Sequence, residues 1–164
     1  MQVLLRQMRS EDWISVAEIY LQGIRSGNAT FETEVPSWEK WDATHLKSCR
    51  ITALVDGEVV AWAALVPVSA RKVYSGVAEV SIYVRDTYKG QGIGRSLLER
   101  LILESETEGF WTLQAVIFPE NGASLKIHED LGFRKVGYRE KIAMMNKEWR
   151  DTILLERRHK ITET

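Results

Sequence analysis

The chain has 164 residues, of which 45% are hydrophobic and 27% are charged. This composition is typical of one folded domain and excludes a disordered or fibrous protein. Its 22 Lys and Arg residues are balanced by 23 Asp and Glu residues, leaving a formal net charge of -1, so the protein as a whole does not attract nucleic acid or anionic lipid. We therefore expect one domain over residues 1–164 that binds no nucleic acid and captures any anionic ligand locally.

The first half of the chain alternates between strand and helix patterns. Residues 3–8 have the pattern of a short strand, and Ser10 is placed to cap a helix whose apolar residues recur at the helical period over 13–24. The stretch 27–41 is polar and aromatic without a steady period. It either wraps a site or starts a second helix near Trp38.

A hairpin and a further strand follow. Asp56-Gly57 lies between two β-rich runs, 51–55 and 59–66, and Asp-Gly in that setting is the strongest short hairpin signal because both turn residues need positive φ. Pro67 ends the second strand, since it lacks a backbone donor. Residues 78–84 form the next β-rich run.

The second half of the chain continues the alternation and ends in strands. The elements expected are an amphipathic helix over 92–108 stopped by Gly109, a strand over 112–117, a helix over 121–131 ended by Gly132, a strand over 133–138, a hairpin over 142–157 that turns near Asn146-Lys147, and a solvated tail over 157–160. This order predicts an α+β domain with a mixed central sheet and helices on both faces.

No targeting, thiol or metal signal stands out. The apolar runs are shorter than the roughly 18 residues that cross a bilayer, and residues 1–9 are too interrupted by Gln and Arg for a signal peptide. We expect a cytoplasmic protein without a membrane partner. No His or Asp motif flanks the single cysteine, Cys49, which disfavours a catalytic thiol. No metal is expected, because the histidines are isolated at His45, His128 and His159.

The loop 88–95, Tyr-Lys-Gly-Gln-Gly-Ile-Gly-Arg, lies between an expected strand and an expected helix. A helix N-terminus exposes unpaired N–H groups, and glycines let the backbone approach a phosphate closely. Lys89 and Arg95 add positive charge. A plain tight turn is the alternative, but phosphate binding is favoured. The spacing fits neither the nucleoside triphosphate loop GxxxxGK[ST] nor the dinucleotide fingerprint GxGxxG.

Three blocks of sequence resemble the GNAT superfamily of acetyl-CoA-dependent N-acetyltransferases: Glu79 to Val84, Lys89 to Gly94, and Asn121 to Phe133. Within that superfamily the chain is similar to the phosphinothricin and methionine sulfoximine acetyltransferase subgroup. The features that carry this closer likeness are Ala29-Thr30-Phe31-Glu32, Arg71 with Tyr74, and Ala78-Glu79. The resemblance covers nearly the whole chain.

The resemblance implies a GNAT fold in which two parallel strands, ending near Val84 and Ile117, splay apart and admit the pantetheine arm of acetyl-CoA, the co-substrate. The residues that it implies for the cofactor are Ile82, Tyr83, Val84, Gly90, Gln91, Gly92, Ile93, Gly94, Arg95 and Asn121. Lys89 departs from the Arg or Gln that the superfamily carries at this point; it keeps the charge but loses bidentate geometry.

Acetyl transfer to an amine needs a proton acceptor, a polarised carbonyl and a thiolate that can leave. The resemblance implies Glu79 as the base, and a backbone N–H near Ile82 or Tyr83 can stabilise the oxyanion. Many superfamily members carry a tyrosine acid where this chain has His128. His128 can donate a proton, contact the cofactor or serve the structure.

The resemblance also implies where the acceptor binds. Arg71 fits as the cation for a carboxylate, and Phe31 and Tyr74 can pack on an aliphatic body. We expect acetylation of the α-amino group of a small amino acid or toxic analogue, such as phosphinothricin or methionine sulfoximine, hence detoxification by a homodimer. The alternatives are acetylation of a peptide or protein amine, and a non-catalytic acyl-CoA-binding regulator, against which the retained Glu79 argues.

Overall fold

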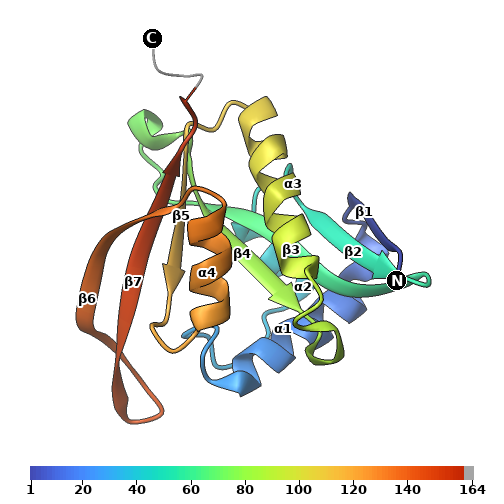
Figure 1. The fold of residues 1–164 in the computed structure, drawn as a ribbon, viewed down its shortest axis with the longest axis horizontal. Coiled ribbons are helices and arrows are strands. Elements are labelled where there is room, and N and C mark those ends of the chain that lie inside the picture. Colours follow the sequence, from blue (N-terminus) through green and yellow to red (C-terminus); the bar gives the residue numbers. More distant parts are fainter. Residues whose placement is uncertain (161–164) are drawn as a thin grey trace.

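A mixed sheet of seven strands, in the order β1-β2-β3-β4-β5-β7-β6, runs through the computed structural model, which describes residues 1–160 (Figure 1). The strands are β1 (Val3–Gln7), β2 (Ile51–Val55), β3 (Glu58–Pro67), β4 (Val77–Val84), β5 (Thr112–Ile117), β6 (Arg134–Met145) and β7 (Glu148–Arg158). The helices are α1 (Trp13–Ser26), α2 (Trp38–Thr44), α3 (Ile93–Thr107) and α4 (Gly122–Asp130). Within residues 1–160 no helix is both long and apolar enough to span a membrane.

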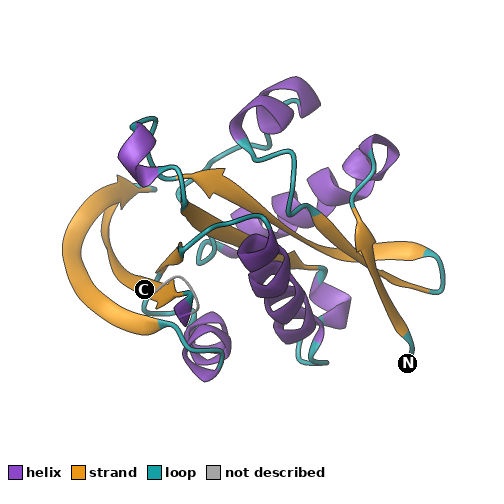
Figure 2. Cartoon of the chain, turned by 90° about the horizontal axis from the view of Figure 1, so that it is seen from above, coloured by secondary structure: helices purple, strands orange, loops and turns teal. Residues whose placement is uncertain are grey.

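Helices cover both faces of the sheet, as the sequence predicts (Figure 2). On one face, α3 inserts Leu97, Leu98 and Leu101 into a core cluster with the inward side chains of the strands. On the other face, Ile19 of α1 and Trp41 of α2 pack with residues of β2 and β3. The two clusters hold the sheet rigidly between them, because fully buried side chains of this size each contribute about 2 kcal/mol through burial.

The parallel pair β4 and β5 separates along its length. The two strands pair at three positions, Val77 with Thr112, Ala78 with Leu113 and Glu79 with Gln114. Beyond Glu79, β4 stays paired with β3, and β5 stays paired with β7. The expected splay is therefore confirmed, and the sheet has a fork that begins at Glu79.

The start of α1 corrects the prediction that Ser10 caps it. Residues 10–12 form a 3-10 turn, and the Ser10 hydroxyl donates to Glu11 at 3.3 Å instead. The Asp12 carboxylate accepts a bond from the Arg9 backbone N–H at 2.8 Å and two from the Arg6 guanidinium at 2.7 and 2.9 Å. A carboxylate makes charge-assisted hydrogen bonds that a hydroxyl cannot match, so Asp12 organises this end.

The turns lie where the sequence places them. Asp56 and Gly57 have φ of 50° and 81°, and Asn146 and Lys147 have φ of 51° and 66°, the positive values that tight hairpin turns need. Pro67 is the last residue of β3. These signals are local, which is why they predict correctly.

The C-terminal strands differ from the prediction of a strand over 133–138 and a separate hairpin. One strand, β6, runs from 134 to 145 and pairs with β7, with register shifts between Lys135 and Gly137 and between Arg139 and Ala143. Irregular pairing of this kind bends a strand without ending it, and β6 curves around β7 in Figure 2. The predicted solvated tail over 157–160 is wrong in part: Arg157 belongs to β7 and bonds Glu106 at 2.9 Å, whereas Arg158 and Lys160 are exposed.

Candidate functional site

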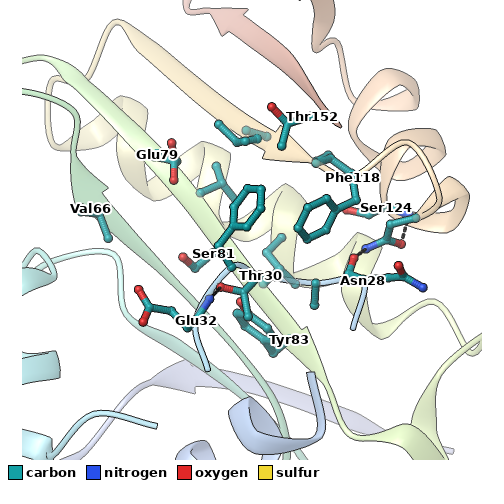
Figure 3. Close-up of a pocket in the computed structure, with 18 of the residues that line it drawn as sticks. Asn28, Thr30, Glu32, Val66, Glu79, Ser81, Tyr83, Phe118, Ser124 and Thr152 are labelled. Atoms are coloured by element: carbon teal, nitrogen blue, oxygen red, sulfur yellow. Dashed lines mark hydrogen bonds between the residues drawn. The ribbon is translucent and has the colours of Figure 1, made fainter. Parts of the chain in front are cut away.

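Two adjoining cavities open at the fork. The fork cavity, about 450 Å³, lies between the separated parts of β4 and β5 and is bordered by residues 28–32 (Figure 3). The glycine-loop cavity, about 290 Å³, lies between β4 and the starts of α3 and α4. The residues that line both are Ala29, Ile82, Tyr83, Asn121, Ser124 and His128. The two cavities therefore form one continuous cleft.

The glycine-loop cavity has the properties of an anion site. Gly90 and Gly92 have φ of 78° and 83°, and a Cβ at either would meet no heavy atom within 4 Å, so backbone conformation and not space calls for glycine there. Gly92 is the N-cap of α3, whose first N–H groups point out of the helix. Lys89 and Arg95 line the cavity, and both are ion-paired at its rim, Lys89 with Asp86 at 3.0 Å and Arg95 with Asp130 at 3.2 Å.

Not every loop residue shares that position. Gly90, Gly92, Ile93, Gly94 and Arg95 line the cavity together with Ile82, Tyr83 and Val84, as the sequence predicts. Gln91 is not among the lining residues; its side-chain amide donates to the Thr87 carbonyl at 3.4 Å.

Asn121 lines both cavities and also holds the local fold. Its side-chain oxygen caps α4 by accepting a bond from the Ser124 N–H at 3.3 Å, and its amide donates to the Asn28 carbonyl at 3.4 Å. Asn121 therefore connects the start of α4 to the segment that follows α1.

Glu79 lies on β4 at the last pair before the fork. Its carboxylate lines the fork cavity (Figure 3) and accepts a hydrogen bond from Nε2 of Gln114 at 2.8 Å. The charged residues that line the described cavity are Glu79 and Glu32, with no Lys or Arg among them. The cavity is therefore suited to an amine, which is cationic before it reacts.

His128 lies where the two cavities meet. Its Nδ1 is 2.8 Å from the Ser124 carbonyl oxygen, which can only accept, so we assign the proton to Nδ1 and a lone pair to Nε2. Burial lowers the pKa of His128, and its ring meets Phe133 edge-on at a centroid distance of 4.9 Å. Nε2 is buried and has no hydrogen-bond partner in residues 1–160. His128 is accordingly a neutral acceptor.

Two tyrosines form the opposite wall. Tyr83 stacks on Trp62 at 4.9 Å and contacts Tyr20 at 5.0 Å between ring centroids. Burial raises the pKa of both tyrosines, and the charge of nearby Glu32 adds to the rise. Both phenols therefore stay protonated at neutral pH. Gly23 makes room for this wall, because a Cβ there would lie 2.6 Å from the Tyr83 ring.

Phe31 lines the fork cavity, as expected, and meets Phe118 edge-on at a centroid distance of 4.9 Å. The Arg150 guanidinium lies 4.2 Å from the Phe118 ring centroid and donates to the Gly27 carbonyl and to Asn28 Oδ1, each at 2.8 Å. Arg150, from the distant strand β7, thus anchors the segment that carries Phe31.

Arg71 and Tyr74 lie apart from the other predicted site residues. They belong to the connection between β3 and β4, where the Arg71 guanidinium lies 5.8 Å from the Tyr74 ring centroid. Neither residue lines either cavity. The single chain therefore does not bring Arg71 and Tyr74 together with Phe31 and Glu79.

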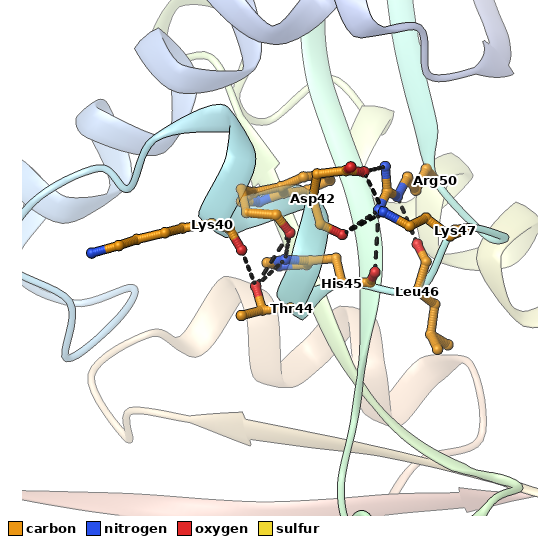
Figure 4. A network of polar contacts seen from close by, with 8 residues as sticks. Lys40, Asp42, Thr44, His45, Leu46, Lys47 and Arg50 are labelled. Carbon is orange, nitrogen blue, oxygen red and sulfur yellow. Dashed lines mark hydrogen bonds and ion pairs between the residues drawn. The ribbon is translucent and has the colours of Figure 1, made fainter.

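No motif in the sequence singles out His45, which lines the fork cavity, or Gln114, which donates a hydrogen bond to the lining residue Glu79 at 2.8 Å. The ring of His45 stacks on Trp41 at 4.1 Å, and the loop behind it is held by Arg50, which donates to Asp42 Oδ1 at 2.6 Å and to the His45 carbonyl at 3.1 Å (Figure 4). No motif marks such residues, because tertiary contacts place them. Alternation along β5 is the signal that could have indicated Gln114.

Cys49 provides no nucleophile. It is buried within the core cluster on the α3 side of the sheet. Burial raises the pKa of its thiol to about 11, so the thiol stays protonated and unreactive at neutral pH. Residues 1–160 also contain no group of three or more His, Cys, Asp or Glu side chains arranged to hold a metal ion.

Comparison with known proteins places this cleft in a family. The Acetyltransferase (GNAT) family matches residues 8–133. The phosphinothricin N-acetyltransferase of Alcaligenes faecalis is 30% identical over 93% of this chain and 81% of its own length. The L-methionine sulfoximine/L-methionine sulfone acetyltransferase of Pseudomonas aeruginosa is 31% identical over 61% of this chain and 58% of its own length.

A solved structure shows the same likeness. The phosphinothricin acetyltransferase of Sinorhizobium meliloti in complex with AcCoA superposes with a TM-score of 0.88, covering 96% of this chain and 89% of that chain at 28% identity. The match spans the forked strands, the glycine loop and both helical layers. The chain belongs to the GNAT family of acetyltransferases.

Proposed function

We propose that this protein transfers the acetyl group of acetyl-CoA to the α-amino group of a small amino acid or toxic analogue, such as phosphinothricin or methionine sulfoximine, in the cytoplasm. The observation that carries the proposal is the forked cleft, with Glu79 at the start of the fork and the glycine loop at the far end. The names of the relatives from Alcaligenes faecalis and Pseudomonas aeruginosa support the acceptor class.

The cleft fits acetyl-CoA. The left-handed glycines and the outward N–H groups of α3 suit a pyrophosphate. The edge of β4 that faces the gap, from Ile82 to Val84, is free of β5 and can bond the amides of a pantetheine arm. When bound, acetyl-CoA supplies an activated thioester. The complex of the Sinorhizobium meliloti relative with AcCoA supports this assignment.

The residues of this chain then have distinct tasks. Glu79 accepts the proton of the amine as it attacks, and a backbone N–H near Ile82 or Tyr83 stabilises the negative charge on the carbonyl oxygen. His128 enters as a neutral imidazole with its proton on Nδ1. It can therefore give a proton from Nε2 to the thiolate only after it has first taken one there.

The acceptor occupies the fork cavity. Its volume of about 450 Å³ lies in the range of small-molecule sites, and Phe31 and Phe118 offer an apolar wall. A carboxylate on the acceptor needs a cation, and no Lys or Arg within residues 1–160 of one chain lines this cavity. We assign that task to Arg71, with Tyr74 beside it, from a second copy in a homodimer.

A second candidate function rests on the same lining. Glu32 and Glu79 without a lining cation favour an amine that has no adjacent carboxylate, as at the N-terminus of a peptide. A regulator without catalysis is less well supported, because the Glu79 carboxylate is present and held in the cavity.

The test is release of free thiol from acetyl-CoA against a panel of phosphinothricin, methionine sulfoximine, other amino acids, polyamines and short peptides. We expect the two analogues to have the highest kcat/KM. Activity confined to peptides would establish the second function instead. Tight acetyl-CoA binding without thiol release from any amine would support the regulator.

A further inference from the structure

Gln114 lies directly across the sheet from Glu79. The two residues form the last register pair of β4 and β5 before the strands separate. Nε2 of Gln114 donates to Oε1 of Glu79 at 2.8 Å. Because an ionised carboxylate only accepts hydrogen bonds, the Gln114 amide must turn its NH₂ group toward Glu79.

Gln114 also lies on the correct face of its strand. Successive side chains of β5 alternate, and Leu113 and Ala115 enter the core cluster on the α3 side. Gln114 therefore points to the opposite face, together with Val116, which lines the fork cavity. Gln114 is therefore not part of the core cluster on the α3 side. The strand by itself would accept any residue with a preference for β-structure at this position.

We propose that Gln114 is a positioning residue for Glu79. It holds Oε1, so that the carboxylate is fixed in one orientation and Oε2 is left to take the proton of the amine. The proposal rests on the proposed function, in which Glu79 is the base.

The surroundings make this contact decisive. Within residues 1–160, the Glu79 carboxylate accepts its side-chain hydrogen bond from the Gln114 amide, and no Lys or Arg of these residues lines the cavity to take the place of that donor. A hydrogen bond to a charged group is stronger than one between neutral groups, and a tenfold change in an ionisation equilibrium corresponds to one pH unit. Removal of the donor should therefore move the acidic limb of the pH profile.

Two variants of Gln114 separate the donor from the side-chain shape. Gln114→Met keeps the length and removes the N–H, and we expect kcat/KM to fall about tenfold at neutral pH and its acidic limb to move up by about one pH unit. Gln114→Glu places a second carboxylate beside the first. We expect a larger upward shift of the acidic limb, because two neighbouring carboxylates repel each other and one of them keeps its proton to a higher pH. Acetyl-CoA affinity, measured by calorimetry, should be unchanged in both.

Two controls keep the outcomes distinct. Thr112→Val changes a residue on the same face of β5, two positions before Gln114. This variant should leave the pH profile unchanged. If Gln114→Met shows the wild-type profile, or loses activity only in proportion to a lowered Tm, the positioning role is wrong. Glu79→Gln tests the proposed function separately: full activity of that variant would overturn the base assignment whatever Gln114 does, and a loss above about a hundredfold supports it.

Discussion

The Asp12 carboxylate shows how one side chain can organise the entry to a helix. Its side chain is 6% exposed and bonds Arg6 and the Arg9 N–H. Burial by itself raises the pKa of Asp12, but the hydrogen bonds from Arg6 and Arg9 outweigh it and hold that pKa below the ordinary value of 3.8. The folded state therefore binds this proton less readily than the unfolded chain does.

A stability prediction follows for Asp12. Asp12→Asn leaves Arg6 without its charged partner, so the free energy of unfolding should fall by about 3 kcal/mol at neutral pH. The ionised Asp12 stabilises the fold above its ordinary pKa of 3.8, and this stabilisation is lost as the pH falls through the lowered pKa of the folded state. The difference in unfolding free energy between variant and wild type should therefore narrow below pH 3.8. Urea unfolding over a pH series measures this; a gap that is constant with pH would contradict it.

Sequence reasoning located some site residues and missed others for a physical reason. Glu79 and the glycines of loop 88–95 carry recognisable motifs, and the structure brings them into one cleft. Gln114 and His45 acquire their positions from a neighbouring strand and from a stacked Trp41. Such contacts leave no trace in local sequence.

At the scale of elements, the loop before α3 depends on left-handed backbone. Gly92 and Gly57 have nearly the same φ, 83° and 81°, and open space at the Cβ position. Alanine at either position should cost about 1–2 kcal/mol of stability through backbone strain alone. Gly92→Ala should also weaken acetyl-CoA binding, whereas Gly57→Ala, in the distant β2–β3 turn, should not. Calorimetry and thermal unfolding of both variants test this pair, and equal effects on affinity would contradict it.

Element prediction succeeded where the signal was local and failed where it was not. Local signals predict the Asp56-Gly57 turn and the amphipathic α3, whereas the splay of β4 from β5 is implied by the family resemblance. The prediction divides the long β6 in two, but residues 139–141, which lie between the two predicted strands, belong to one strand. Pairing with β7 carries the strand through both register shifts.

For the whole molecule, the half-buried His45 and the buried His128 predict sensitivity to acid. Burial lowers the pKa of both His45 and His128 from 6.5. The unfolded chain thus takes up protons first, and stability that is complete above pH 6.5 declines as the pH falls below it. His45→Phe retains a ring against Trp41, so its Tm should fall less than that of wild type between pH 7 and 5. Thermal unfolding followed by circular dichroism at several pH values tests this. If the Tm of the variant and that of wild type fall equally with pH, His45 is not the source of the acid sensitivity.

The proposed homodimer predicts complementation between inactive variants. Apolar side chains lie exposed on the β6–β7 hairpin, and Trp149 is 57% exposed. If Arg71 serves the cavity of the other subunit, Arg71→Ala and Glu79→Gln should each be inactive, and refolding them together should restore about a quarter of wild-type activity, because half of the dimers then hold one complete site. No recovery in a mixture shown by sedimentation to be dimeric would place Arg71 outside the partner's site.

Where β4 and β5 separate, the edge of β4 that faces β5 is left without a paired strand. Backbone amides on the open edge of β4 beyond Glu79 lack β5 as a partner, and unpaired amides exchange hydrogen with solvent readily. A donor molecule lying along that edge would complete the sheet, and at 100 times its dissociation constant it would add about 2.7 kcal/mol to stability. Resistance to proteolysis, and with it the lifetime of the protein in a cell, would then rise and fall with the supply of acetyl-CoA.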